Sequence, residues 1–224
     1  MTEGHEYFLC ALRNLGDEEL EEPSALPGWT RKHVLSHVGH NARALARLTH
    51  WAATGELTPM YPSPSARDEE IETGTLWSAA RLRTFVEEEQ VRLSIALERL
   101  TCAGWRAEVV TAQGRTVPAT VIPWLRSREL WVHATDLRSG ADFAGFPADF
   151  TDALITDAVT RRRTAQLVEV SARATDRTVN TFADGDVVAE GTAADLARWL
   201  TGRGTHPQLG TATGDPLPEL PPWL

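Results

Sequence analysis

The feature that most limits how this chain can fold is the helical spacing of its apolar residues over the first 164 positions. Apolar residues recur at intervals of three and four, the pattern of a helix with one buried face. The pattern appears in five segments, residues 7–15, 30–53, 82–100, 118–137 and 150–163. Residues 105–117, around Gly114, predict a hairpin-like excursion instead. The sequence therefore predicts a helical bundle over residues 1–164.

The chain changes character after residue 164. Short strands are predicted at 167–172, 178–182 and 187–189, the middle one more weakly than the others. Asp184–Gly185 is a turn signal between the last two. Residues 192–200 predict a short capped helix that Gly202 ends. We therefore expect a small α/β domain with a short antiparallel sheet over residues 165–224, and an α+β class for the chain.

Composition and charge argue against two kinds of partner. The formal net charge is −9, whereas binding to nucleic-acid phosphates needs a clustered excess of Lys and Arg. No apolar run reaches the roughly 20 residues that span a bilayer. The acidic start, MTEGHEYFLC, lacks the pattern of a secretory signal. We expect a cytoplasmic protein without a nucleic-acid or membrane partner, although a local arginine can still bind a small anionic substrate.

Cysteine usage bears on the chemistry. The chain has two cysteines, Cys10 and Cys102, which have neither a redox CxxC spacing nor a metal-ligand spacing. Each lies in an apolar helical pattern, so we expect both to be buried. A thiol that takes part in a reaction here would therefore come from another molecule.

Histidines and a glutamate in two predicted helices have the spacing of a metal site. Glu129 and His133 are four residues apart, so both project from one face of a helix. His33, His37 and His40 lie on another helix. Two imidazoles and one carboxylate make a ligand set that leaves one metal position open for chemistry. Spacing alone does not choose between His37 and His40.

A structural interpretation of the same residues is also available. Glu-x-x-x-His pairs occur on many helices without a metal, where they are solvated or hydrogen-bonded. Apolar neighbours nevertheless predict that the helix around Glu129 is buried, and a buried carboxylate needs a partner. Neutral imidazoles with a carboxylate, and no cysteine, favour Zn²⁺ without excluding other divalent ions.

Several segments together resemble the mycothiol-dependent maleylpyruvate isomerases, a family within the DinB-like metal-binding superfamily. They lie in order from near the N-terminus to the C-terminus, which makes the set specific although each segment alone is weak. The segments are LPGWTRKHVLSHVGHNARAL, THWAATGELTPMY, TAQGRTVPA, RSRELWVHATDL, the Gly-Arg-Gly at 202–204 and the closing PPWL.

The resemblance implies a fold and a set of site residues. The family fold is a DinB-like four-helix bundle followed by a small α/β domain. The family's first metal ligand is the histidine of an H-V-x-x-N segment, here His37. The other two belong to the RSRE-x-W-x-H segment, here Glu129 and His133. The catalytic arginine lies in the Gly-Arg-Gly, here Arg203, which could otherwise be only a cation at a helix C-terminus.

The resemblance also implies a reaction, the cis–trans isomerisation of maleylpyruvate to fumarylpyruvate in gentisate degradation. A metal-bound low-molecular-weight thiol would add to the double bond, which then rotates before the thiol is expelled. Metal coordination deprotonates a thiol outright. Mycothiol is the thiol that the family implies, ergothioneine is an alternative, and the sequence does not choose between them. Arg203 would bind a carboxylate or enolate oxygen of the small anionic diketo-acid substrate.

Three further residues are candidates for supporting roles. Arg126 and Asp136 lie three positions before Glu129 and three after His133, so they can support the ligands, or form surface pairs. Arg115 can reach an anionic substrate, or only solvate a loop. Two other functions stay open, a metal- and thiol-dependent S-transferase and a non-catalytic binding module that a metal stabilises.

Overall fold

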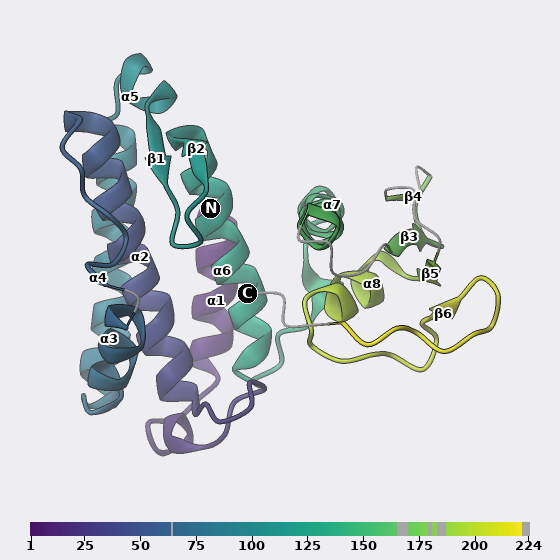
Figure 1. Cartoon of the computed structure of the whole chain (residues 1–224). Coiled ribbons are helices and arrows are strands. Elements are labelled where there is room, and N and C mark those ends of the chain that lie inside the picture. The colour runs from purple at the N-terminus through teal and green to yellow at the C-terminus, as the bar shows by residue number, and fades with distance from the viewer. Residues whose placement is uncertain (64, 165–169, 179–180, 183–186, 221–224) are drawn as a thin grey trace. The chain divides into compact units, whose positions relative to one another are not determined.

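The computed structural model describes residues 1–63, 65–164, 170–178, 181–182 and 187–220. The chain divides into two compact units, Met1–Ala141 and Asp142–Leu224 (Figure 1). The first unit is helical apart from one small hairpin, and the second combines helices with a small sheet. The α+β class that the sequence predicted is confirmed.

Four long helices form the bundle of the first unit. α2 packs against both α4 and α6, and α6 packs against α1 (Figure 1). Their bounds are Thr2–Arg13 for α1, Arg31–Thr54 for α2, Ala79–Glu98 for α4 and Ile122–Asp136 for α6. Shorter elements connect them: η1 (Glu18–Glu21), α3 (Ala66–Thr75), α5 (Cys102–Arg106) and η2 (Ala119–Val121).

Helix α2 is central to the bundle and has defined ends. Thr30 is its N-cap, and the backbone N–H of Thr30 donates to Nδ1 of His33 at 3.1 Å. Gly55 ends the helix with φ of +76°, a left-handed conformation that glycine adopts without a steric penalty. Packing against α4 is close at Gly39, where a Cβ would lie 2.3 Å from the ring of Phe85. Only a residue without a side chain fits there.

Two apolar clusters fill the bundle. One joins α1, the start of α2, the start of α4 and the end of α6, through residues that include Phe8, Leu12, Val34, Val38, Leu82, Val86, Leu130 and Leu137. The other joins the second half of α2 to α4 and to the start of α6, and includes Leu45, Leu48, Leu93, Leu97, Ile122 and Leu125. The apolar stripes read from the sequence are therefore the faces that pack.

The hairpin predicted around Gly114 is confirmed. β1 (Glu108–Val110) pairs antiparallel with β2 (Thr116–Pro118), and Gly114 takes φ of +75° in the turn between them. The N–H of Thr111 donates to the carbonyl of Arg115 at 2.9 Å and closes the turn.

In the residues that the structure describes, the second unit contains two helices, a 3-10 turn and a four-stranded sheet. The helical elements are η3 (Phe143–Gly145), α7 (Ala148–Thr164) and α8 (Ala193–Leu200). The strand order is β4-β3-β5-β6, with bounds Thr181–Phe182, Val170–Ala174, Val187–Gly191 and Gly210–Thr211. The outer pairs are antiparallel, as predicted, and the central β3–β5 pair is parallel. Asp184–Gly185 and the start of the strand predicted at 167–172 lie outside the described residues.

The division between the units falls earlier than the boundary at 164/165 that the sequence suggested. α7 has the same helical periodicity as the bundle, which is why the sequence grouped them. In the structure α7 packs against α8 and β3 and belongs to the second unit. Helical periodicity identifies a buried face but not the partner that covers it.

Both cysteines are exposed, so the prediction that they are buried was wrong. The buried face of α1 contains Phe8, Ala11 and Leu12, and Cys10 lies on the opposite side of the helix. Cys102 is the first residue of α5. Among the residues that the structure describes, no helix is long and apolar enough to cross a membrane.

Candidate metal centre

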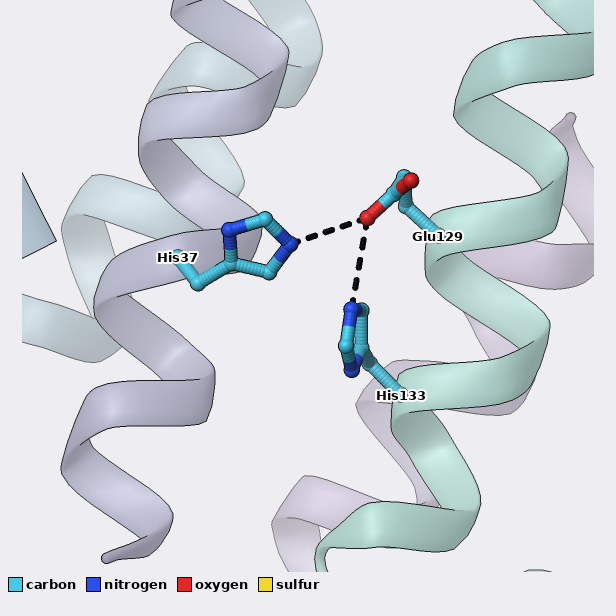
Figure 2. Close-up of side chains that lie close together, drawn as sticks. All are labelled: His37, Glu129 and His133. Carbon is cyan, nitrogen blue, oxygen red and sulfur yellow. Dashed lines mark hydrogen bonds and ion pairs between the residues drawn. The ribbon is translucent and has the colours of Figure 1, made fainter. Parts of the chain in front are cut away.

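Three side chains from two helices converge inside the bundle. α2 supplies His37, and α6 supplies Glu129 and His133 from successive turns (Figure 2). Nε2 of His37 lies 2.9 Å from Oε2 of Glu129, and Nε2 of His133 lies 3.3 Å from the same oxygen. One potential ligand atom from each of the three lies within 4.8 Å of the others. All three side chains are buried.

This arrangement fits a tetrahedral divalent metal. With bonds of about 2.1 Å, two ligands of a tetrahedral zinc ion are about 3.4 Å apart. The two nitrogen–oxygen distances of 2.9 and 3.3 Å are close to that value. The same ring nitrogen, Nε2, faces the shared centre from both imidazoles (Figure 2). Distances slightly shorter than those around a metal ion are expected here, because hydrogen bonds hold the three side chains together.

The structure distinguishes the three candidate histidines of α2, His33, His37 and His40. His33 uses Nδ1 at the N-cap of the helix. The ring of His40 packs 4.7 Å from Phe85, and its Nδ1 lies 3.4 Å from Oε2 of Glu70. Only His37 of the three is grouped with Glu129 and His133. The geometry therefore favours His37, the alternative that the family resemblance also favoured.

The pKa values of the two imidazoles in the cluster shift in opposite directions. Burial favours the neutral form of Glu129, but hydrogen bonds from His133 and His37 outweigh it and hold the carboxyl pKa well below its ordinary value. Burial also lowers the pKa of His37 to about 4. Burial acts on His133 in the same direction, but its contacts with Asp136 and Glu129 raise that pKa overall. A neutral His37 and an anionic Glu129 are the forms that bind a metal.

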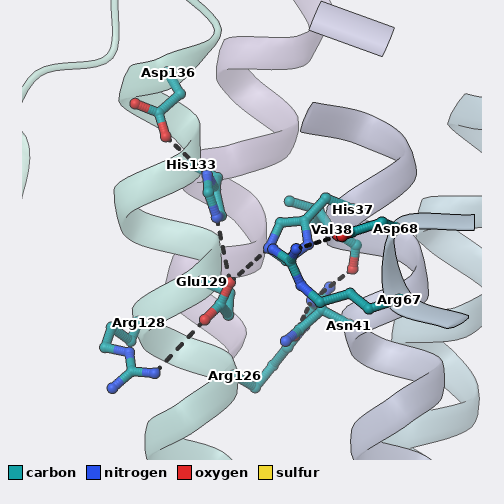
Figure 3. A network of polar contacts seen from close by, with 10 residues as sticks. All are labelled: His37, Val38, Asn41, Arg67, Asp68, Arg126, Arg128, Glu129, His133 and Asp136. Atoms are coloured by element: carbon teal, nitrogen blue, oxygen red, sulfur yellow. Dashed lines mark hydrogen bonds and ion pairs between the residues drawn. The ribbon is translucent and has the colours of Figure 1, made fainter. Parts of the chain in front are cut away.

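Asp136 and Arg128 lie next to the ligands on α6 (Figure 3). Oδ2 of Asp136, which is fully buried, lies 2.8 Å from Nδ1 of His133. This contact leaves Nε2 of His133 as the nitrogen that faces the cluster, which is the usual arrangement behind a metal-bound histidine. Nη2 of Arg128 lies 3.7 Å from Oε1, the second carboxylate oxygen of Glu129. Each ligand on α6 thus has a charged neighbour behind it.

Arg126 is fully buried and connects α6 to two other helices. Its guanidinium donates to the carbonyl of Val38 at 2.7 Å and to Oδ1 of Asn41 at 3.0 Å, both on α2. It also donates to Oε1 of Gln90 on α4 at 2.9 Å. These bonds fix the helix segment that follows His37. Arg126 was predicted to support the ligands, and the structure places it as a link between helices beside them (Figure 3).

The remaining two predicted residues are Arg115 and Arg203. Arg115 is exposed in the β1–β2 turn of the first unit. Arg203 belongs to the second unit and follows α8. Its backbone N–H donates to the carbonyl of Arg198 at 2.9 Å, and that of Gly202 donates to Trp199, also at 2.9 Å. With φ of +76° at Gly202, these bonds form a Schellman cap. Gly202 therefore ends α8, as the sequence predicted.

Two residues near the cluster were not found by sequence reasoning. Arg128 immediately precedes Glu129, so adjacency to a predicted ligand was a usable signal. Arg67, on α3, is directed toward His37, and its charge contributes to lowering the pKa of that histidine (Figure 3). α3 has a weak apolar pattern, and nothing in the local sequence indicates that this arginine approaches α2.

Comparisons with known proteins agree with the geometry. The family model described as the mycothiol maleylpyruvate isomerase N-terminal domain matches residues 1–138. The crystal structures of the mycothiol-dependent maleylpyruvate isomerase and of a histidine-to-alanine mutant of it each match with a TM-score of 0.92 and 36% identity. Both matches cover 99% of this chain and 93% of the other. A search among curated proteins gave no match. The chain belongs to the mycothiol-dependent maleylpyruvate isomerase family.

Proposed function

We propose that this protein is a thiol-dependent isomerase that converts maleylpyruvate to fumarylpyruvate. The observation that carries the proposal is the buried His37–Glu129–His133 cluster in a chain that matches the family over nearly its whole length. Three protein ligands leave a fourth position on a tetrahedral ion. A site that served only to hold the bundle together would be expected to supply four.

We propose Zn²⁺ as the metal, because two imidazoles and a carboxylate suit it and no cysteine is present in the set. When bound, the metal would keep the cofactor thiol deprotonated, and addition of that thiolate to the cis double bond makes the bond single for long enough to rotate. The reaction is balanced, since expulsion of the same thiolate restores the double bond. Mycothiol is the proposed thiol on family grounds, with ergothioneine as the alternative.

The protein's own groups prepare this chemistry. Glu129 is held as an anion by its two histidine neighbours, and it would offset one of the two positive charges of a bound divalent metal. Asp136 accepts a hydrogen bond from Nδ1–H of His133 and so leaves Nε2 as the nitrogen that can bind a metal. The three ligand side chains are buried, and a low-dielectric site strengthens the electrostatic contacts made there.

We propose that Arg203 binds an oxygen of the substrate, where negative charge develops when the thiolate adds. The support is the Gly-Arg-Gly of the family pattern and the two glycines that flank the arginine with φ of +76° and +89°. A Schellman cap holds the backbone of Arg203 in a defined position. Arg203→Lys keeps the charge and loses the two-pronged donor, so full activity in that variant would refute a bidentate role.

The test is the number of product molecules formed per thiol. Zinc-loaded protein is mixed with maleylpyruvate and sub-stoichiometric mycothiol, with a parallel reaction containing ergothioneine, and the absorbance change is followed. Many turnovers per thiol support the isomerase, and the more effective thiol identifies the cofactor. Consumption of one thiol per substrate would indicate an S-transferase. No reaction with either thiol in folded, metal-loaded protein would refute the proposed reaction.

A further inference from the structure

Under the proposed function, on which this inference rests, the substrate has a second carboxylate that also needs a cationic partner. Maleylpyruvate is a dicarboxylate, and one arginine such as Arg203 binds one carboxylate bidentately. The occupied metal site would not attract the other carboxylate. A divalent ion carries two positive charges, Glu129 contributes one negative charge and a bound thiolate another, so the occupied site is neutral overall. Another cation near the cluster is needed.

The arginines of the first unit near the cluster differ in how available they are. Arg126 is fully buried and donates to three acceptors on two helices. Arg128 is also buried and lies against Glu129. Arg47 donates to the carbonyl of Met60 at 2.6 Å and to Glu70 at 2.9 Å. The guanidinium groups of these three arginines are held by contacts within the protein, so they have little freedom to turn toward a ligand.

Arg67 has a different environment. Its side chain is 39% exposed, and its ion pair is with the adjacent Asp68, which is 74% exposed, at 2.9 Å. Exposed pairs of this kind contribute on the order of 1 kcal/mol or less, so a ligand carboxylate can displace Asp68. The side chain of Arg67 is directed toward His37 (Figure 3). A partly exposed cation therefore lies beside a proposed metal ligand.

Tyr61 adds a neutral donor to the same place. Its side chain is half-buried and packs against the apolar cluster that joins the second half of α2 to the start of α6, and the charges of both Arg67 and Glu129 act on its hydroxyl. Burial raises the pKa of Tyr61 to about 12, so the phenol keeps its proton at neutral pH. The protonated hydroxyl can donate to an oxygen of a ligand.

We propose that Arg67, assisted by the hydroxyl of Tyr61, binds a carboxylate of the substrate beside the metal cluster of the first unit. Arg67 then determines the preference for dicarboxylates over monocarboxylates. It holds the carbon chain of the substrate over the metal position while leaving the double bond free to rotate. Its effect is on binding, so a change at Arg67 should alter KM much more than kcat.

The test compares Arg67→Gln with the wild type. A charge-assisted hydrogen bond contributes about 1.5–3 kcal/mol, so we expect KM for maleylpyruvate to rise roughly 10- to 100-fold while kcat changes less than about threefold. Arg67→Lys should recover part of the loss. Arg13→Gln, which removes an exposed arginine on α1, is the matched control and should leave KM unchanged.

A binding measurement separates this inference from the proposed function. Maleate, an unreactive cis-dicarboxylate, is titrated calorimetrically into zinc-loaded protein without thiol. We expect Arg67→Gln to weaken maleate binding about tenfold or more, and propionate binding to be equal in the two proteins. Equal maleate affinity in the two proteins, or no maleate binding to the wild type, would overturn the role of Arg67. If the wild type fails to turn over maleylpyruvate but the maleate difference is present, the reaction is refuted and the anion site stands.

Discussion

Removal of the carboxylate behind His133 should weaken metal binding without unfolding the protein. Asp136 is fully buried, and its Oδ2 lies 2.8 Å from Nδ1 of His133. The contact fixes the ring so that Nε2 faces Glu129 and His37. Asp136→Asn keeps the shape of the side chain and loses the charge. His133 then becomes a weaker ligand, and the neutral ring can also adopt the other tautomer.

The size of the effect follows from the structure. Loss of a hydrogen-bonded partner behind a ligand typically lowers metal affinity about 10- to 100-fold, or about 1.4–2.7 kcal/mol. In Asp136→Asn the oxygen of the new amide can still accept a hydrogen bond from His133, so we expect a loss near tenfold. Asp136→Ala removes the acceptor altogether and leaves a buried space, so we expect a loss near 100-fold.

The assay is a competition titration of zinc against a chelator, performed at the same pH for the wild type and each variant. Asp17→Asn is the control, because Asp17 is an exposed acid paired with Arg83. Far-ultraviolet circular dichroism checks that each variant is folded. Zinc affinity in Asp136→Asn equal to that of the wild type would refute the supporting role of Asp136.

Other predictions concern the stability of the bundle and the pH dependence of zinc binding. Arg126→Met leaves buried acceptors unpaired, so urea unfolding should show a loss of about 3 kcal/mol or more; a loss below about 1 kcal/mol contradicts the linking role. Gly39→Ala places a Cβ against Phe85 and should cost about 1–3 kcal/mol by the same method, and an unchanged midpoint would show that the helices can separate freely. The raised pKa of His133 means that a proton competes with metal there as pH falls, whereas His37, with a pKa of about 4, is already neutral. The logarithm of zinc affinity between pH 5 and 8 should therefore rise by at most one per pH unit, and a slope of two would contradict this division.

Local spacing was enough to find much of the site. Glu129 and His133 are neighbours on one helix face wherever a helix forms, so their pairing follows from helix geometry. The choice between His37 and His40 did not follow from spacing, because both are buried on α2. They differ in what surrounds them, and the ring that packs on His40 belongs to Phe85 on another helix. Such long-range contacts are not encoded in the local pattern.

The same reason accounts for the other differences. α7 was grouped with the bundle because its periodicity gives no information about the partner that it packs against. The parallel pairing of β3 with β5 joins strands that are not adjacent in sequence, and no turn motif specifies it. Asp136 was predicted beside His133 and lies there, since i,i+3 residues on a helix meet. Arg67 was not found because its approach to His37 depends on where α3 packs against α2.

The most direct test of the central claim is whether the thiol binds at the metal. The protein is loaded with Co²⁺ in place of Zn²⁺, mycothiol is added without substrate, and the near-ultraviolet spectrum is recorded. We expect a new sulfur-to-cobalt charge-transfer band that saturates at one thiol per metal and is absent in Glu129→Ala, which loses a ligand. An unchanged spectrum in cobalt-loaded wild-type protein, under conditions where the thiol supports turnover, would contradict the claim that the open metal position holds the thiol.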